Sequence, residues 1–201
     1  MSEPLYIQSY CRIRNGLVAL NGESLFTGDT QRFGEFMKSL YKHLNLDHSK
    51  FFKMDNLSKL AFMGAEILLG EKTEKELALV FSNRAASLDT DRRHQASISP
   101  AGEGYASPAV FVYTLPNISM GEISIRYALH SENAFFVQEQ FDPELLHTYS
   151  ENLITTKKAK KVLCGWVDYD AGKYDAFLYI VANKGTFAHA IGEITRLYQT
   201  Q

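Results

Sequence analysis

Apolar side chains recur along this chain at the spacings of helices and of strands. A period of three to four residues predicts a helix over residues 30–44, whose apolar face is Phe33, Phe36, Met37, Leu40, Tyr41 and Leu44. A second helix is predicted from Asp55, its N-cap, to Gly70, its terminator. Small residues at 61, 64 and 65 would let that helix pack closely on a sheet. Further helices are predicted over residues 90–98, 118–129 and 187–198.

Short apolar runs predict strands over residues 6–14, 17–20, 77–82, 134–137, 161–168 and 176–182. The first two are expected to form a hairpin, because Asn-Gly pairs bracket the second run. The last two are expected to pair antiparallel across a short connection. Residues 107–117 fit a strand or a helix equally well, and residues 99–104 predict a flexible loop.

The stretch 131–154 predicts a strand that turns directly into a helix. Asp142 followed by Pro143 favours a helix start, because the carboxylate accepts from free N–H groups and proline fits the first turn. We call the turn before this helix the elbow; it comprises Gln138, Glu139, Gln140, Phe141 and Asp142. A helix N-terminus directs free N–H groups and partial positive charge at what precedes it, so the elbow is a candidate site.

Composition narrows the class of protein. The 201 residues, 45% of them hydrophobic, suffice for one sizeable core, so we expect a single domain over residues 1–201, of α/β class with helices layered on a mixed sheet. The net charge of −2 gives no electrostatic reason to expect nucleic acid or an anionic membrane as a partner. The basic run 157–161 is predicted to be a solvated helix end.

The residues give no reason to expect a metal or a cofactor. Cys11 and Cys164 lie in apolar runs without metal-ligand spacing, and the six histidines form no ligand pair. His147 is predicted to face solvent on the elbow helix. The N-terminus lacks the pattern of a signal peptide, and no apolar run approaches the roughly 20 residues of a membrane span, so a cytoplasmic location is expected.

Several local signatures occur in a fixed order. Residues 107–117 contain Pro108, Phe111 and a closing Asn117; residues 121–125 read Gly-Glu-Ile-Ser-Ile; residues 127–131 form a turn; and the strand 162–168 ends at Asp168. Together with the strand 134–137, these segments resemble the N-terminal half of a β-ketoacyl synthase, the thiolase-fold condensing enzyme of fatty-acid and polyketide synthesis. The resemblance implies a thiolase-like half, with a mixed, mostly parallel sheet of about five strands and helices on its faces.

The resemblance places the nucleophilic cysteine of the family at Gln140. A primary amide cannot accept an acyl chain as a thioester, and the catalytic histidines of the family belong to a C-terminal half beyond the segments matched. Glutamine at this position resembles the non-condensing partner called a chain-length factor and the loading domain that only decarboxylates malonyl groups. We therefore expect no catalytic residue in this chain, although its status as an enzyme stays open.

Two functions follow. The first is a non-catalytic subunit that pairs with an active β-ketoacyl synthase, as a chain-length factor does, in fatty-acid or polyene-type polyketide biosynthesis with acyl carrier protein. The second is a stand-alone enzyme or binding protein that holds, transfers or decarboxylates acyl thioesters at the elbow around Gln140. The charged cluster Asp89, Asp91, Arg92 and Arg93 could contact an acidic carrier protein, but a solvated helix end is the preferred interpretation.

The resemblance also predicts a partner interface. In the family the strand before the elbow pairs with its counterpart across a two-fold axis, and an apolar edge strand without lysine or proline needs such cover. The predicted interface residues are Asn133, Ala134, Phe135, Phe136, Val137, Pro108 and Phe111. A heterodimer with the synthase or a homodimer satisfies this, and the alternative is an interior strand of a monomer.

Overall fold

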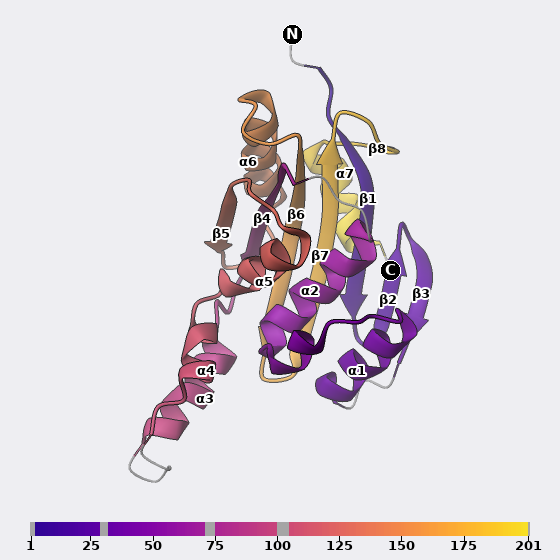
Figure 1. Ribbon diagram of the computed structural model, residues 1–201. Coiled ribbons are helices and arrows are strands. Elements are labelled where there is room, and N and C mark those ends of the chain that lie inside the picture. Colours follow the sequence, from indigo (N-terminus) through magenta and orange to yellow (C-terminus); the bar gives the residue numbers. More distant parts are fainter. Residues whose placement is uncertain (1–2, 29–31, 71–74, 100–104, 201) are drawn as a thin grey trace.

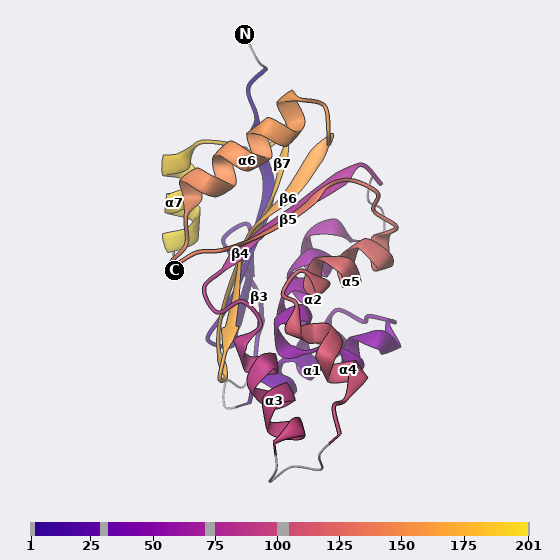
Figure 2. The ribbon, with the colours of Figure 1, turned by 90° about the vertical axis from the view of Figure 1, so that its left-hand side faces the viewer.

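The computed structural model describes residues 3–28, 32–70, 75–99 and 105–200. Within them a twisted mixed sheet carries helices on both faces (Figures 1 and 2). The strands are β1 (Tyr6–Arg14), β2 (Leu17–Leu20), β3 (Glu23–Thr27), β4 (Leu77–Asn83), β5 (Asn133–Val137), β6 (Lys161–Asp170), β7 (Lys173–Ala182) and β8 (Phe187–Ala188). The helices are α1 (Phe33–His43), η1 (Ser49–Lys53), α2 (Asn56–Leu69), α3 (Leu88–Ile98), α4 (Pro108–Phe111), η2 (Val112–Thr114), α5 (Ile118–Tyr127), α6 (Pro143–Thr155) and α7 (Ile191–Gln199).

The sheet has the order β3-β2-β1-β7-β6-β4-β5, and β8 pairs with β1 outside this path. The predicted α/β class is confirmed. The expectation of about five, mostly parallel strands is wrong: the described residues form eight strands, and among their pairings only β4·β5 and β4·β6 are parallel. Short turns with positive φ at Asn15, Asn21 and Ala171 fold successive segments back on one another, and such turns make antiparallel neighbours.

Most predicted elements are present, with shifted ends. The hairpin β1–β2 and the antiparallel pair β6–β7 are confirmed, whereas β3 was not predicted. The ambiguous segment 107–117 is helical, since Pro108 starts α4. Helix α5 ends early because Ala128 adopts the left-handed conformation. The helix predicted from residue 187 begins at Ile191, because residues 187–188 pair with β1. Residues 30 and 31 of the first predicted helix and residues 100–104 of the predicted loop lie outside the described residues.

Two apolar cores cover the two faces of the sheet. One contains α1, α2 and α5 and centres on residues such as Phe36, Leu60 and Phe81; the other lies under α6 and α7 and includes Leu146 and Tyr179. Figure 2 shows these two layers of helices with the sheet between them. The predicted close packing of α2 is confirmed at Gly64, where a Cβ atom would lie 2.5 Å from Leu178 Cδ1.

Glycine at position 165 lets β6 and β7 approach. A Cβ atom there would lie 2.0 Å from the carbonyl oxygen of Phe177, a contact that only backbone movement can relieve. We predict that Gly165→Ala lowers the free energy of unfolding by about 3 kcal/mol or more, as severe overpacking does. The control is Gly121→Ala in α5, where a Cβ atom meets nothing within 4 Å, and this change should stabilise the helix by up to about 1 kcal/mol. Urea denaturation of both variants measures the difference, and equal stabilities would contradict the prediction.

Candidate functional site

The N-terminus of α6 is closed by its own cap. Asp142 Oδ1 accepts from the backbone N–H groups of Glu144 and Leu145, at 3.0 Å each, and the Asp142 carbonyl accepts from Leu146 at 3.4 Å. Pro143, the remaining residue of the first turn, has no N–H group. The predicted cap is therefore confirmed, and it occupies the N–H groups of Glu144 and Leu145. The expectation that α6 directs free N–H groups at the elbow is wrong for Glu144 and Leu145, because the carboxylate of Asp142 accepts from both.

The elbow is a solvent-exposed bend between β5 and α6. Gln140 and Glu139 are exposed, and Gln140 lies two residues before the capping Asp142 rather than on the helix itself. Gln138 continues the ladder, since its N–H donates to the Asn83 carbonyl at 2.8 Å. Residues 138–143 line a hollow of about 390 Å³. Glu139 and Asp142 border this hollow. Their negative charges disfavour the binding of an anion and the formation of a thiolate there.

Phe141 anchors the elbow to the body of the protein. Its ring stacks on Tyr198 of α7 at a centroid distance of 3.9 Å and meets Phe177 edge-on at 5.8 Å. The aromatic contacts explain why the chain turns at this residue, since the ring enters the core under α7 while its neighbours stay outside. The sequence placed Phe141 in the elbow without indicating this packing role.

Strand β5 is a terminal strand of the sheet. Its parallel pairing with β4 uses the Glu132 carbonyl, which accepts from Leu79 N, and Gln138 N, which donates to Asn83. Even-numbered residues therefore bond to β4, and the backbone groups of Asn133, Phe135 and Val137 point to the free edge. The structure thus shows β5 at an edge, whereas the alternative of an interior strand does not fit the sheet order.

The two phenylalanines of β5 point to opposite faces of the sheet. Phe135 packs against the core under α5, and Phe136 packs against the core under α6, with its ring 5.1 Å from that of Tyr149. Both are half-buried, and Val137 beside them is 58% exposed. The free edge of β5 therefore offers backbone hydrogen-bonding groups flanked by apolar side chains.

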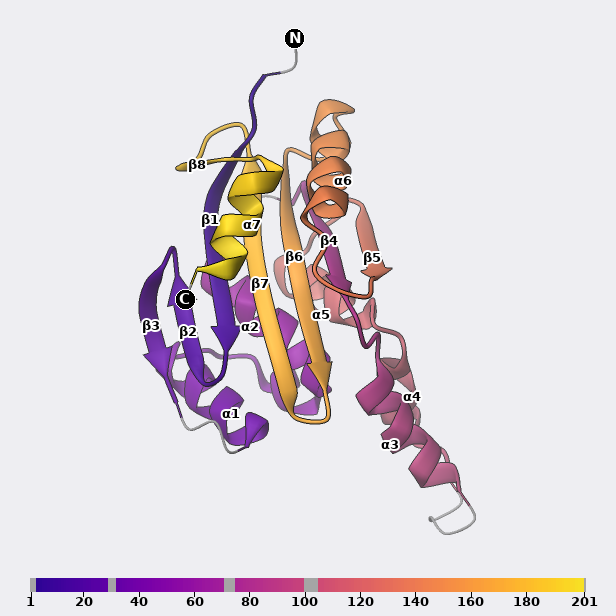
Figure 3. The ribbon, with the colours of Figure 1, turned by 180° about the vertical axis from the view of Figure 1, so that it is seen from behind.

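A helical arm projects from the sheet on the side of β5 (Figures 1 and 3). We use the term arm for residues 88–99 and 105–117, which include α3, α4 and η2. Pro108 and Phe111, both predicted interface residues, lie on α4 and are exposed. Eight of the eleven exposed large apolar side chains of the described residues lie on the arm, α5 or β5: Leu88, Ile98, Tyr105, Phe111, Val112, Leu115, Ile125 and Val137. Six of these eight were not predicted, because residues 107–117 show no clear period and the others stand singly.

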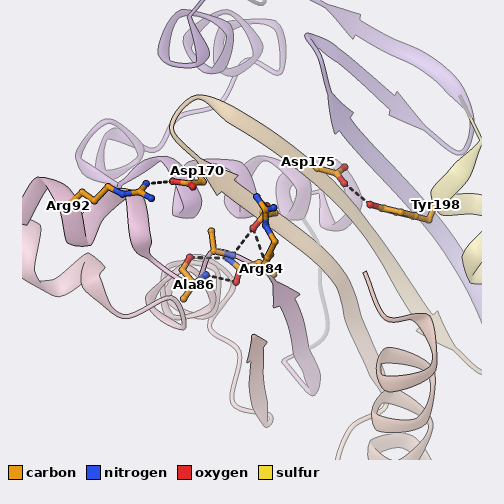
Figure 4. A network of polar contacts seen from close by, with 9 residues as sticks. Arg84, Ala86, Arg92, Asp170, Asp175 and Tyr198 are labelled. Carbon is orange, nitrogen blue, oxygen red and sulfur yellow. Dashed lines mark hydrogen bonds and ion pairs between the residues drawn. The ribbon is translucent and has the colours of Figure 1, made fainter. Parts of the chain in front are cut away.

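Polar contacts hold the base of the arm at the C-terminal ends of β4 and β6 (Figure 4). Asp168 Oδ1 accepts from the N–H groups of Arg84 and Ala85 at 3.0 Å, and the Asn83 side chain both donates to and accepts from Ala86. Arg92 of α3 pairs with Asp170 at the end of β6. Arg92, one of the two arginines in the charged cluster at residues 89–93, therefore has a structural role within the chain.

A buried polar pair, Ser150 and His189, links α6 to the segment that follows β8. Ser150 Oγ lies 3.3 Å from His189 Nε2, and the His147 ring stacks on that of His189 at 4.5 Å. His147 is half-buried and its Nε2 lies 3.1 Å from the His189 carbonyl oxygen, so the expected solvent-facing position is wrong. Burial, with the neighbouring His147 as a second cause, lowers the pKa of His189 to about 3. His189 therefore stays neutral and has a structural role.

The thiols are not nucleophiles. Burial raises the pKa of Cys11 and of Cys164 to about 12, and both side chains are fully buried, as predicted. Among the described residues no group of three histidine, cysteine, aspartate or glutamate side chains is arranged to hold a metal ion. Nor does any helix in the described ranges combine the length and the apolar character that crossing a membrane requires.

No protein-family model matches the chain, and no curated protein matches it. Solved structures do. The ishigamide ketosynthase/chain length factor superposes with a TM-score of 0.63 at 16% identity, over 89% of this chain and 62% of that chain. The ketosynthase ApeO in complex with its chain length factor ApeC, from Xenorhabdus doucetiae, gives a TM-score of 0.63 at 15% identity, over 98% of this chain and 91% of the matched one.

A third structure, the type II polyketide synthase complex AntDE:AntF, an acyl carrier protein with its ketosynthase, gives a TM-score of 0.58 at 14% identity, over 89% of this chain and 62% of that chain. Against the ishigamide and AntDE proteins the chain spans about three fifths of their length. The likeness shows that this chain has the thiolase-like fold of ketosynthase and chain length factor proteins, as the sequence resemblance predicted.

The neutral state of His189 makes stability depend on pH. Its pKa is lower in the folded chain than in the unfolded one, so below about pH 6.5 the unfolded state takes up a proton that the folded state refuses until about pH 3. The contribution of His189 to the free energy of unfolding is therefore fully present above pH 6.5. It is lost on acidification, by about 2 kcal/mol at about pH 5. We predict that His189→Gln flattens the pH dependence of unfolding in this window, measured by urea denaturation.

The matched control is His130→Gln, at an exposed position. It should leave the pH profile of the wild-type chain in place, and a profile that His189→Gln fails to change would refute the assignment.

Proposed function

We propose that this chain is a non-catalytic, ketosynthase-like subunit that pairs with an active β-ketoacyl synthase as a chain length factor does. The pathway is one of fatty-acid or polyene-type polyketide biosynthesis that uses an acyl carrier protein. The observation that carries this proposal is the concentration of exposed apolar side chains along the arm and β5. Gathered exposed apolar side chains mark interaction sites, and one of them here, Val137, lies on a free strand edge.

The elbow supports a non-catalytic role. A condensing site needs a thiolate that helix N–H groups stabilise, and this elbow has Gln140 in place of a nucleophile and the Asp142 carboxylate on the N–H groups. The same two features argue against the stand-alone enzyme that would use the elbow for acyl thioesters. The fold likeness adds that a chain of similar extent occurs in the ApeO/ApeC complex.

The proposed contact has two parts. The backbone groups of Asn133, Phe135 and Val137 extend the sheet into the partner, and the apolar side chains of the arm, including Pro108 and Phe111, cover the seam. The half-buried Phe135 and Phe136 contribute by shaping the two faces of β5, and Ala134 lies between Asn133 and Phe135 on the strand. A homodimer through the same edge is the competing assembly.

Val137→Pro tests the seam. It removes an N–H group that points away from β4, at an exposed position of an edge strand, so the chain itself should lose less than about 1 kcal/mol of stability. We predict at least a tenfold loss, as an order of magnitude, in co-purification with a ketosynthase encoded in the same operon. The control Val137→Thr keeps the N–H group and the side-chain shape, and it should co-purify like the wild-type chain.

Light scattering after size exclusion separates the outcomes. A wild-type chain that stays monomeric alone and beside the synthase refutes the proposal, and a homodimer that excludes the synthase refutes the heterodimer.

Phe111→Asp tests the arm independently of β5. The side chain is 59% exposed, so its loss costs the isolated chain little, whereas a charge in an apolar interface weakens binding. We predict a synthase affinity lower by about tenfold or more, measured by titration calorimetry. Phe52→Asp is the control, since Phe52 is 51% exposed on η1, which belongs neither to the arm nor to β5. An equal effect of both changes would contradict a role for the arm.

A further inference from the structure

The arm has almost no apolar core of its own, although it projects well beyond the sheet (Figures 1 and 2). Among its residues only Thr90 and Tyr113 are buried, and no residue of α4 is. Its large apolar side chains, such as Phe111 and Leu115, lie on the outside. Burial of apolar surface therefore contributes little to holding the arm, and its direction depends on polar contacts at its base.

Each of the two buried residues of the arm donates a hydrogen bond to a buried carboxylate outside the arm. Thr90 Oγ1, on the outgoing helix α3, donates to Asp55 Oδ2 at 2.8 Å. Tyr113 OH, on the returning segment η2, donates to Glu122 Oε1 at 2.8 Å. The two acceptor residues are only 7% and 5% exposed. We call these two hydrogen bonds the anchor contacts, and bonds to a buried charged group are among the stronger ones in proteins.

The two carboxylates are themselves fixed by other contacts. Asp55 Oδ1 accepts from Ser58 N at 2.8 Å and so caps α2. Glu122 lies on α5, and its Oε2 is 2.7 Å from Lys50 Nζ of η1. Since α2, α5 and η1 all contribute side chains to one apolar core, each carboxylate joins the arm to a part of the protein that packs on the sheet.

The two anchor contacts lie close together. Burial raises the pKa of Tyr113, and the hydrogen bond with Glu122, the charge of Glu122 and the charge of Asp55 raise it further. The Tyr113 hydroxyl therefore keeps its proton near pH 7 and stays a donor. Because both carboxylates act on this one hydroxyl, the outgoing and returning segments of the arm are held at one place.

Two other polar contacts at the base of the arm add less. Arg92 pairs with Asp170, but its side chain is exposed, and exposed ion pairs contribute little to stability (Figure 4). Ser87 Oγ donates to the Thr114 carbonyl, which joins the outgoing and returning segments to each other. Neither contact replaces a hydrogen bond to a buried carboxylate.

We infer that Thr90 and Tyr113 are positioning residues of the synthase interface. Through Asp55 and Glu122 they hold the arm in the direction in which its exposed apolar side chains meet the partner. The inference rests on the proposed function, which makes the arm part of an interface. An arm that is already held in place loses less conformational entropy on binding, so the affinity depends on buried contacts that never touch the synthase.

The test is the double variant Thr90→Val/Tyr113→Phe, which removes both donor hydroxyls and keeps the shapes of the side chains. In the isolated chain, amide hydrogen exchange of the arm should be faster by about tenfold or more, while β6 and β7 exchange as before. The synthase affinity should fall by about tenfold, measured by titration calorimetry. If the double variant does not fold, the two single changes provide the same test.

Two controls separate positioning from a general loss of stability. Thr90→Ser keeps the hydroxyl and should match the wild-type chain in both measurements. Tyr198→Phe removes the same kind of contact elsewhere, because Tyr198 OH donates to Asp175 Oδ2 at 2.8 Å on the other face of the sheet. This control should leave the exchange of the arm and the synthase affinity unchanged.

Faster exchange confined to the arm, together with weaker binding, supports the inference. Three results overturn it: unchanged exchange of the arm in the double variant, unchanged synthase affinity despite faster exchange, and an equal loss of affinity in Tyr198→Phe and Tyr113→Phe. A wild-type chain that does not bind the synthase refutes the proposed function instead, and the exchange of the arm still decides whether the anchor contacts hold it.

Discussion

Burial of β4 on both faces and along both edges determines how the molecule is arranged. All seven residues Leu77–Asn83 are buried, so helices must cover both faces and strands must lie on either side. Those neighbours, β5 and β6, run parallel to β4, and parallel strands require crossover connections, which α5 and α6 provide. Parallel strands also end together. The arm, the elbow and Asp168 therefore gather at the C-terminal end, and Glu76, Lys160 and Lys161 gather at the opposite end.

Asp142 at the elbow stabilises α6 and, through the same contacts, disfavours an anion at that helix end. The helix α6 needs acceptors for its first N–H groups, and Asp142 provides them at 3.0 Å. A carboxylate in that place also cancels the partial positive charge that would favour a thiolate or an oxyanion. With Gln140 two residues earlier on an exposed bend, the elbow offers neither a nucleophile nor a helix end that would stabilise an anion.

Much of the fold followed from sequence because local rules decided it. Periodic apolar faces located α1 and α2, and the pair Asp142 and Pro143 located α6. Sheet order did not follow, because strand pairing depends on contacts distant in sequence. Strand β3 was missed because Glu23–Thr27 is half exposed and carries no strong alternation. The resemblance selected Gln140 as a candidate and β5 as an interface strand, and the sheet order places β5 at an edge. The packing of Phe141 on Tyr198 and the proximity of Lys184 to residues 157–161 could be seen only in the structure.

The two edges of the sheet differ in how well they are protected against pairing. At one edge, β3 contains the charged Glu23, and its pairing with β2 has a register shift at Val18 and Ala19. Charge and irregular pairing both discourage a further strand. At the other edge, β5 pairs with β4 in unbroken register and contains no charged residue or proline. Since unprotected edges tend to pair with other chains unless something covers them, the contrast between β3 and β5 favours β5 over β3 as the edge for the proposed interface.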